Sequence, residues 1–251
     1  MSQNVSDAHT ARTSLEGRRV AITGGTTGIG RATAVLLASE GARVFICGRD
    51  PRHLEDSLAR IREVGEGDGL AIDLAERDSV NRFFEAACDY LGGLDVAVLN
   101  AAIPVEGLTD VDELELRYAI ATDFTAYVMG AYAAQKRMES GDIVLVGSLS
   151  AHSLKPGSTV YAGIKAGIAA FAEALRKELG DKGIKVSLIE PGFTGADFHY
   201  PRIGPEEQAR LINAQQMLRA EDIAVGIHYL LTQPERTVVQ QLAIVPRVTT
   251  E

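Results

Sequence analysis

Short apolar runs alternate with longer amphipathic stretches along nearly the whole chain. The runs are rich in Val, Ile and Leu, which is typical of strands covered on both faces and so of a parallel sheet. Strands are predicted at Arg19–Thr23, Arg43–Cys47, Gly69–Ile72, Val96–Leu99, Asp142–Gly147, Lys185–Ile189 and Gln241–Val245. Helices are predicted at Ile29–Ser39, Pro51–Val64, Arg77–Leu91, Val111–Met138, Ser158–Leu179 and Ala220–Leu231. This alternation predicts an α/β chain with a doubly wound parallel sheet, which binds its ligand at the carboxyl ends of the strands.

Two segments depart from the alternation. Phe193–Leu218 follows the sixth strand, contains prolines and glycine, and is weakly helical only over Pro205–Met217. A long segment on the ligand side of a sheet predicts a binding loop or lid. Residues 1–14 are polar and aperiodic, which predicts a disordered tail. We therefore expect one domain over residues 15–251, with the lid at about 193–218.

Composition narrows the class of protein. A length of 251 residues suits one large α/β domain or two small ones, and no linker or repeat divides the chain. The hydrophobic fraction of 46% predicts a full core. A net charge of -9 argues against nucleic acid or an anionic membrane as the main partner, although it leaves room for a local basic pocket.

Cysteine and histidine positions bear on compartment and metal content. Cys47 and Cys88 have no Cys or His at ligand spacing, which indicates small buried residues in a reducing compartment. The five histidines are scattered, so no metal site is predicted. Neither a signal peptide nor an apolar run of transmembrane length is recognisable, and a cytoplasmic protein is expected.

A glycine-rich turn follows the first strand. Gly24, Gly28 and Gly30 have the spacing G-x-x-x-G-x-G and lead into a helix. The commoner dinucleotide fingerprint is G-x-G-x-x-G, but the physics is shared. Glycine lets the backbone approach a pyrophosphate, and the helix N-terminus favours the anion. The alternative is an ordinary strand–helix turn with spare glycines.

The end of the second strand indicates which dinucleotide binds. An acid there would bind a ribose 2′-hydroxyl, whereas an arginine suits a 2′-phosphate. Gly48 stands where the acid is expected and Arg49 follows at once, which favours NADP(H) over NAD(H). A solvated arginine without this role is the alternative. Asp50 is interpreted as the cap of the next helix.

Tyr161 and Lys165 stand four residues apart, so on a helix they share one face. A nearby ammonium lowers the pKa of a phenol, which starts at about 10. Such a tyrosine exchanges a proton with an alcohol or ketone near neutral pH. Alone, the pair is usually a solvated helix face; Ser148 upstream and the glycine turn favour the chemical interpretation.

Taken together, these residues resemble the short-chain dehydrogenase/reductase family from about Leu15 to Val248. The resemblance rests on the glycine turn, Ser148, the Tyr161-x-x-x-Lys165 motif and Pro191-Gly192. It implies a single-domain Rossmann fold with a seven-stranded sheet. It also implies NADP(H)-dependent hydride transfer between the cofactor and a ketone, aldehyde or alcohol on a small molecule. The two long predicted helices are similar to the family's dimer-forming pair, so a homo-oligomer, expected to be a tetramer, is implied too.

The resemblance also implies residue roles. Tyr161 would be the general acid in reduction and the general base in oxidation, Lys165 would lower its pKa and hold the nicotinamide ribose, and Ser148 would hydrogen-bond the substrate oxygen. The implied cofactor-binding residues are Gly24, Thr26, Gly28, Ile29, Gly30, Arg49, Asp73, Leu74, Asn100, Ala101, Ala102, Tyr161, Lys165, Pro191, Gly192 and Thr194.

The chain departs from the family pattern at several positions. The family's Asn-Asn-Ala-Gly is Leu99-Asn100-Ala101-Ala102 here. Its catalytic asparagine aligns with Asp123, whose main-chain carbonyl would hold a water that links the lysine to solvent. A helix acid facing solvent is the alternative for Asp123.

The departures leave a catalytically retired cofactor-binding or regulatory protein as the alternative function. An acyl-carrier-linked ketoreductase would need a basic docking patch, which so acidic a chain does not favour.

Substrate identity is not predicted. The residues that we consider for the substrate pocket are His152, Leu154, Phe193, Phe198, His199, Tyr200 and Arg202.

Overall fold

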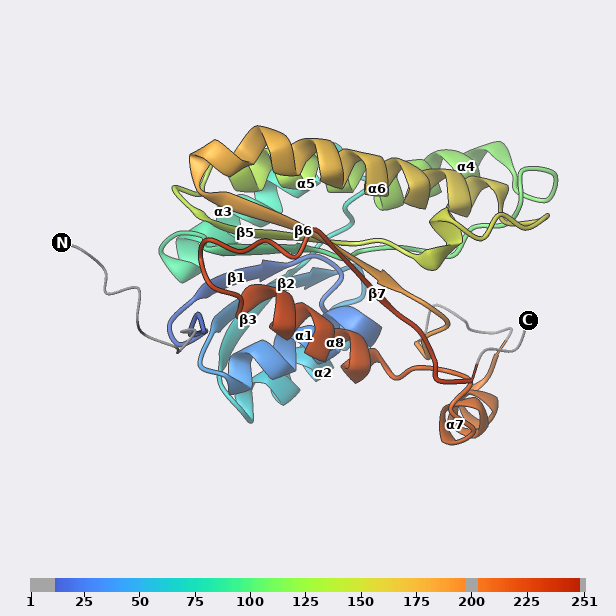
Figure 1. Cartoon of the computed structure of the whole chain (residues 1–251), viewed down its shortest axis with the longest axis horizontal. Helices are drawn as coiled ribbons and strands as arrows, with labels where there is room; N and C mark the ends of the chain where they lie inside the picture. Colours follow the sequence, from blue (N-terminus) through green and yellow to red (C-terminus); the bar gives the residue numbers. More distant parts are fainter. Residues whose placement is uncertain (1–11, 197–202, 249–251) are drawn as a thin grey trace, which may run out of the picture.

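The computed structural model describes residues 12–196 and 203–248, in which a seven-stranded sheet lies between two layers of helices (Figure 1). The strands are β1 (Arg19–Ile22), β2 (Arg43–Gly48), β3 (Glu66–Ala71), β4 (Val96–Leu99), β5 (Gly141–Val146), β6 (Ile184–Pro191) and β7 (Gln241–Ile244). Every pairing is parallel, in the order β3-β2-β1-β4-β5-β6-β7. The predicted doubly wound α/β fold is confirmed.

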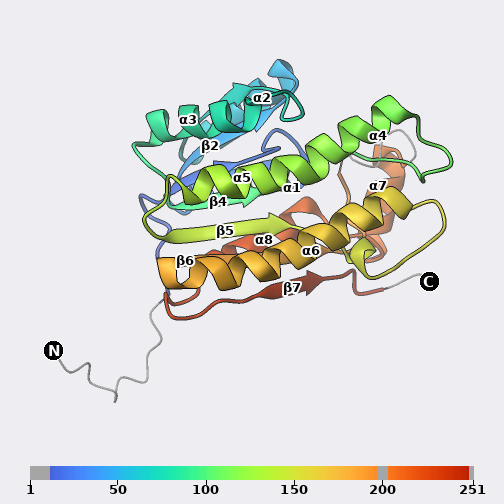
Figure 2. The ribbon, with the colours of Figure 1, turned by 90° about the horizontal axis from the view of Figure 1, so that it is seen from above.

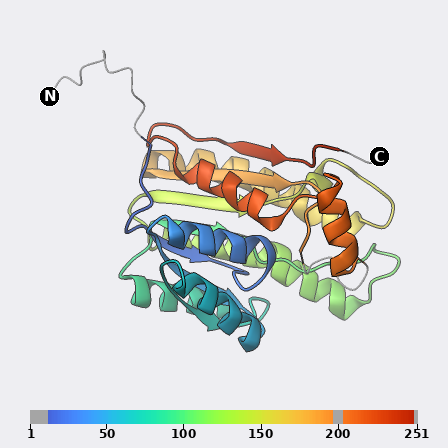
Figure 3. The ribbon, with the colours of Figure 1, turned by 90° about the horizontal axis from the view of Figure 1, so that it is seen from below.

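Each face of the sheet closes its own apolar core. From above, α3 (Ser79–Leu91), α5 (Ala126–Gln135) and α6 (Thr159–Leu179) run along the sheet (Figure 2). From below, α1 (Gly28–Ser39), α2 (Pro51–Arg62) and α8 (Ala220–Leu231) cover the other face (Figure 3). Neighbouring residues of one strand serve both cores, because successive side chains point to opposite faces. In β1, Val20 and Ile22 belong to the lower core and Ala21 to the upper one.

The long helix predicted over Val111–Met138 is present from Glu113 to Gln135, but it is not α-helical throughout. α4 (Glu113–Ile120) is followed by a π-turn at Ala121–Thr125 and then by α5. The turn buries two polar side chains, those of Thr122 and Asp123. Apolar periodicity does not reveal such an insertion, and π-turns are frequent at functional sites.

The third strand begins three residues earlier than predicted, at Glu66. Its first residues include Gly67 and Gly69, which carry no apolar side chain that a pattern could register. A Cβ on Gly67 would lie 2.6 Å from Ile61 on α2, and one on Gly69 would lie 2.7 Å from the Ile46 carbonyl oxygen. Glycine therefore lets neighbouring elements approach this strand closely.

The segment between β6 and α8 carries α7 (Pro205–Asn213), which lies beyond the carboxyl end of the sheet (Figure 1). Gln208 of α7 is buried, and its Nε2 donates to the carbonyl oxygens of Ala196 and Ile203 at 3.2 and 2.9 Å. Residues 197–202 of the predicted lid, like residues 1–11 of the predicted tail, lie outside the described residues. Residues 12–14 of the predicted tail are described. The Thr13 hydroxyl donates to the Gln233 carbonyl oxygen at 2.8 Å, which fixes this segment to the residues that follow α8. No helix of the described residues is long and apolar enough to cross a membrane.

An ion network holds the amino-terminal edge of the sheet, opposite the ligand side. Asp142 at the start of β5 accepts from Arg18 at 2.8 Å and pairs with Lys185 of β6 at 3.0 Å. The three side chains are between 7% and 17% exposed. Opposite charges attract more strongly at such low exposure than at the solvated surface, but a charge left there without a partner destabilises the fold.

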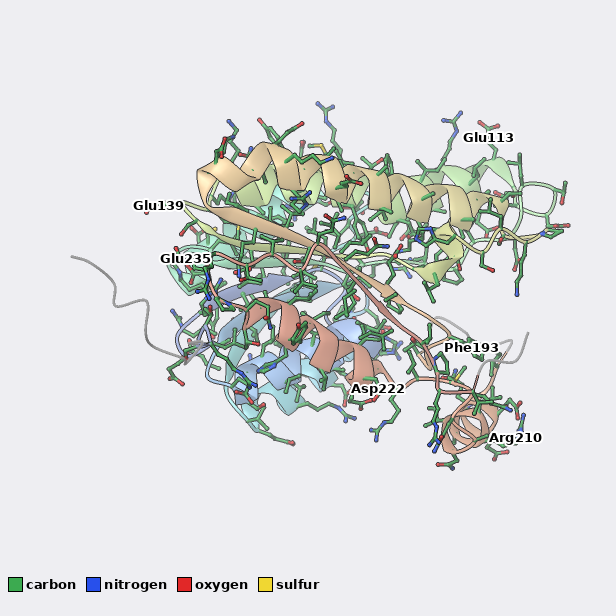
Figure 4. The ribbon with its side chains drawn as sticks, in the orientation of Figure 1. Glu113, Glu139, Phe193, Arg210, Asp222 and Glu235 are labelled. Carbon is green, nitrogen blue, oxygen red and sulfur yellow. The ribbon has the colours of Figure 1, made fainter. Side chains whose placement is uncertain are left out.

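We expect Asp142→Asn to lower the free energy of unfolding by about 3 kcal/mol, because it leaves two nearly buried cations without their acid. Urea unfolding at neutral pH measures the change. Glu113→Gln is the control: Glu113 pairs with Arg117, but both side chains are more than 70% exposed and Glu113 extends from the outer surface of α4 (Figure 4). Its loss should cost about 0.5 kcal/mol or less. Equal effects of the two substitutions would contradict the network's structural role.

Candidate active site

The glycine-rich turn joins β1 to α1 at the carboxyl edge of the sheet. Gly24 and Gly28 have positive φ angles of 65° and 50°, which favour glycine. A Cβ on Gly24 would lie 2.7 Å from Ala101 Cα, and one on Gly30 would lie 2.1 Å from the Gly24 carbonyl oxygen. α1 has no side-chain cap and no acid in its first turn. Its first N–H groups are therefore suited to an anion.

Asn100 fastens the turn to the end of β4. Its Nδ2 donates to the carbonyl oxygens of Thr23 and Gly24, at 3.0 Å each. Its backbone N–H donates to Thr23 Oγ1 at 2.9 Å. The strand order reverses between β1 and β4, and such a switch point opens a ligand crevice in a doubly wound sheet.

Gly48 packs closely against the glycine turn. A Cβ at this position would lie 2.3 Å from Thr26 Oγ1. The interpretation of Gly48 as merely a missing acid is therefore incomplete, and replacing it by aspartate would disturb packing as well as cofactor choice. Asp50 caps α2 as predicted, because its Oδ1 accepts the Arg52 N–H at 2.8 Å.

Ser148, Tyr161 and Lys165 come together at the carboxyl end of β5. Ser148 follows β5, and its Oγ accepts the Ser150 N–H at 3.1 Å. Tyr161 and Lys165 lie one turn apart on α6. All three side chains line one cleft, and a hydrogen bond links Ser148 with Tyr161.

Lys165 is held in a buried position. Its Nζ donates to the Val146 carbonyl at 3.0 Å and lies 5.1 and 5.6 Å from the ring centroids of Tyr127 and Tyr161. The Tyr127 hydroxyl donates to the same carbonyl at 3.1 Å. Burial lowers the pKa of Lys165 to about 8, although the negative charge of Asp123 opposes this shift.

Asp123 lies in the π-turn, with 0% of its surface exposed. Its Oδ1 accepts the Ile103 N–H at 2.9 Å, while Oδ2 is buried without a hydrogen-bond partner in the described part of the chain. Burial raises the pKa of Asp123 to about 7, and the charge of Lys165 acts in the opposite direction. The solvent-facing alternative for Asp123 is therefore wrong; this acid is the charge partner of Lys165.

The expected lowering of the Tyr161 pKa is also wrong for this structure. Burial raises the pKa of Tyr161, and the charge of Asp123 raises it further, while the hydrogen bond with Ser148 lowers it. Lys165 donates to Val146 rather than to the phenol. The four-residue spacing correctly placed Tyr161 and Lys165 on one face of a helix. It could not show that the phenol is buried or that Asp123 lies nearby.

One cleft collects nearly all of the predicted site. Its volume is about 1430 Å³, above the roughly 300–1,000 Å³ of pockets for drug-sized ligands. Every predicted cofactor-binding residue lines it except Gly30, which instead permits close packing within the turn. Asp123 does not line the cleft, and it affects the site through its charge on the lining residue Lys165.

The substrate candidates are only partly brought together. Phe193 lines the cleft and lies between the end of the sheet and α7 (Figure 4). His152 and Leu154 do not line it. The other four candidates, Phe198, His199, Tyr200 and Arg202, lie outside the described residues.

Residues 18–203 match the family model for short chain dehydrogenases. The chain belongs to the short-chain dehydrogenase family. Serine 3-dehydrogenase of Agrobacterium fabrum is 29% identical over 234 residues, which are 90% of this chain and 93% of the relative. An uncharacterized oxidoreductase of Staphylococcus aureus is 28% identical over 241 residues, 93% of this chain and 99% of that protein. The crystal structure of a Burkholderia cenocepacia short chain dehydrogenase in complex with NADP has a TM-score of 0.84 and 27% identity, and covers 93% of this chain and 98% of that one.

This short-chain dehydrogenase has a partly buried contact beside the site, between an exposed histidine and a buried acid, that the sequence did not suggest. Glu190, whose side chain is 1% exposed, accepts from His152 Nε2 at 2.9 Å and from Gln241 Nε2. The contact joins the loop that follows Ser148 to the strand that leads into Pro191-Gly192. His152 and Glu190 are 38 residues apart, and neither stands at a recognisable spacing.

Asp123→Asn should become more stable relative to the native dehydrogenase as the pH rises. The folded-state pKa of about 7 exceeds the unfolded value of about 3.9, so Asp123 contributes stability below about pH 4 that is lost as the pH rises through 7. Asparagine has no such proton to lose. Urea midpoints at pH 5, 6 and 7 should therefore diverge in favour of the variant. Glu113→Gln should follow the native curve, and a pH-independent difference for Asp123→Asn would contradict the raised pKa.

Proposed function

We propose that this chain is an NADP(H)-dependent oxidoreductase that interconverts a ketone or aldehyde and the corresponding alcohol on a small organic substrate. The observation that carries the proposal is the meeting of Ser148, Tyr161 and Lys165 in the cleft that the glycine turn opens. A retired cofactor-binding protein has no need of a hydrogen-bonded Ser–Tyr pair beside a buried lysine.

The residues present fit a nicotinamide dinucleotide. Gly24 and Gly28 leave room that a Cβ would fill, and the uncapped start of α1 suits the pyrophosphate. Arg49 and Asp73 line the cleft at the end of β2 and after β3, where the adenosine is expected. When bound, the nicotinamide supplies a hydride donor or acceptor at C4.

The chain's own residues manage the proton. Tyr161 gives its phenolic proton to the carbonyl oxygen in reduction and takes it back in oxidation, and Ser148 donates a hydrogen bond to the same oxygen. Lys165, which the Val146 carbonyl holds beside the Tyr161 ring, would hold the nicotinamide ribose. Asp123 keeps Lys165 protonated despite its burial, and the Asp123 main-chain carbonyl holds the water of the proton relay.

The deciding assay is a panel of ketones, aldehydes and alcohols, run with NADPH and NADH or their oxidised forms while nicotinamide absorbance is followed. Because a relative at 29% identity is named serine 3-dehydrogenase, the panel includes serine and other 3-hydroxy acids. Turnover with any member supports the proposal. Cofactor binding without turnover across the panel would favour the cofactor-binding alternative.

NADP(H) should be preferred over NAD(H) by at least tenfold, because a charge-assisted contact to phosphate contributes about 1.5–3 kcal/mol. Arg49→Gln should remove most of the preference by weakening NADPH alone. Arg60→Gln is the control, since it changes net charge equally from a surface pair with Asp56 outside the cleft. Equal use of NADH by the native protein would contradict the assignment.

Tyr161→Phe should bind NADPH normally and lose nearly all turnover, because the ring remains and the exchangeable proton does not. Cofactor fluorescence and a rate assay measure the two properties. Tyr90→Phe, which alters a tyrosine outside the cleft, should keep both. Retained activity in Tyr161→Phe would show that another group carries the proton.

We propose a homotetramer in the cytoplasm. Two separate faces expose large apolar side chains: Leu114 and Tyr132 on α4 and α5, and Val225 and Tyr229 on α8. Two self-complementary faces generate a tetramer with closed symmetry. Free Cys47 and Cys88 suit a reducing compartment.

Light scattering should report about four times the chain mass of 26.8 kDa, and Val225→Asp should reduce it to a dimer by charging one face only. Asp222→Asn, on the same helix but in its polar first turn, is the control. A monomeric native protein at micromolar concentration would contradict the assembly.

A further inference from the structure

Tyr118 of α4 connects two cleft residues that come from other elements. Its hydroxyl donates to Asp73 Oδ2 at 2.6 Å and accepts from Arg49 Nη1 at 2.6 Å. The Arg49 guanidinium carbon lies 5.6 Å from the centroid of the tyrosine ring, within the range of a cation–π contact. Arg49 and Asp73 line the cleft, whereas Tyr118 is not one of its lining residues.

The direction of these bonds follows from the ionisation states. Burial raises the pKa of Tyr118, and the hydrogen bond to Asp73 raises it too, so the hydroxyl keeps its proton and donates it to the carboxylate. Its lone pairs then accept from Arg49. The second oxygen of Asp73 accepts the Ala75 N–H at 2.9 Å. Asp73 and Tyr118 are thus each held in one orientation.

Arg49 keeps most of its capacity for a ligand. In the described residues, Tyr118 is its hydrogen-bond partner and no acid pairs with it directly, which leaves the other guanidinium N–H groups available. The neighbouring carboxylate of Asp50 is occupied by Arg52. A guanidinium with free, parallel N–H groups binds phosphate in a bidentate way.

A second arginine–tyrosine–acid group in the same molecule shows the contrast. Arg43 lies 5.6 Å from the ring centroid of Tyr90, whose hydroxyl donates to Glu66 at 3.3 Å. Here Arg43 Nε pairs directly with Glu66 at 2.8 Å, and its Nη1 and Nη2 donate to the carbonyl oxygens of Leu91 and Tyr90. In this group, Nε, Nη1 and Nη2 of Arg43 all bond to protein oxygens, so the arginine has only a structural role. Tyr118 instead stands between Arg49 and the acid, and the other N–H groups of Arg49 stay available to a ligand in the cleft.

We propose that Tyr118 is the positioning residue for cofactor choice: by bridging Arg49 to Asp73 it presents the guanidinium to the ribose 2′-phosphate. The inference rests on the proposed use of NADP(H). An untethered arginine loses its rotamer freedom when it binds phosphate, and the tyrosine removes part of that cost beforehand. Asp73 serves as the anchor of the bridge, in addition to any contact with the adenine.

The test compares binding of 2′,5′-ADP with binding of 5′-AMP, which differ by the 2′-phosphate and need no turnover. Titrations use native protein, Tyr118→Phe, Arg49→Gln, the double variant and Tyr90→Phe as the matched control. Tyr118→Phe keeps the ring and loses the bridge. We expect it to weaken 2′,5′-ADP about fivefold, the effect of one hydrogen bond, and 5′-AMP by less than twofold. In the double variant, the loss should equal that of Arg49→Gln alone, because the tyrosine acts through the arginine.

The outcomes separate this inference from the proposed function. A native protein that binds 5′-AMP as well as 2′,5′-ADP would overturn both. A native preference for 2′,5′-ADP that persists in Tyr118→Phe would overturn the inference alone. Equal weakening of both nucleotides, or additive losses in the double variant, would likewise overturn it. Should Tyr118→Phe fold poorly, Asp73→Asn removes the anchor's charge instead and must also weaken 2′,5′-ADP more than 5′-AMP.

Discussion

The close approach of β1 and β4 at their carboxyl ends is the constraint on which the rest of the site depends. Asn100 draws the two ends together by donating to the carbonyl oxygens of Thr23 and Gly24, and the missing Cβ of Gly24 permits the contact with Ala101. This junction lies where the strand order reverses. The start of α1, the end of β2 and the end of β5 all take their places around it. A side chain in the turn would separate the strands and fill the crevice that they leave.

Charge is used differently at the two ends of the sheet. At the amino-terminal edge, both carboxylate oxygens of Asp142 are paired, one with Arg18 and the other with Lys185, although Arg18 Nε is buried without a partner in the described residues. At the carboxyl edge, polar atoms remain unsatisfied. Asp123 Oδ2 is buried without a hydrogen-bond partner in the described residues, and the exposed Arg49, which lines the cleft, bonds there to Tyr118 and to no acid. Unsatisfied polar groups reduce stability, and they persist where binding or chemistry uses them.

Burial couples the titrating groups of the proposed catalytic centre. Lys165, Tyr161 and Asp123 share a buried region in which the charge of Asp123 raises the pKa of both Lys165 and Tyr161, while the charge of Lys165 lowers that of Asp123. The asparagine expected by resemblance would bring no charge to this region. Aspartate adds one, which raises the pKa of Lys165 against the effect of burial and raises the pKa of Tyr161. The π-turn makes this possible, because it inserts a residue whose polar side chain is directed into the core rather than to solvent.

The sequence by itself determined the alternation of strands and helices, the glycine turn, and the Ser148, Tyr161 and Lys165 set, because these depend on spacings within one or two elements. Only the tertiary structure decided that Asp123 is buried, that Tyr161 has a raised pKa, and that Tyr118 links Arg49 to Asp73. Those two bridge partners lie 69 and 45 residues from Tyr118, in the segments that follow β2 and β3. Apolar periodicity predicts which face of a helix is covered. It cannot predict which polar atom of a distant element will meet that face, because contact and desolvation arise only when the elements pack.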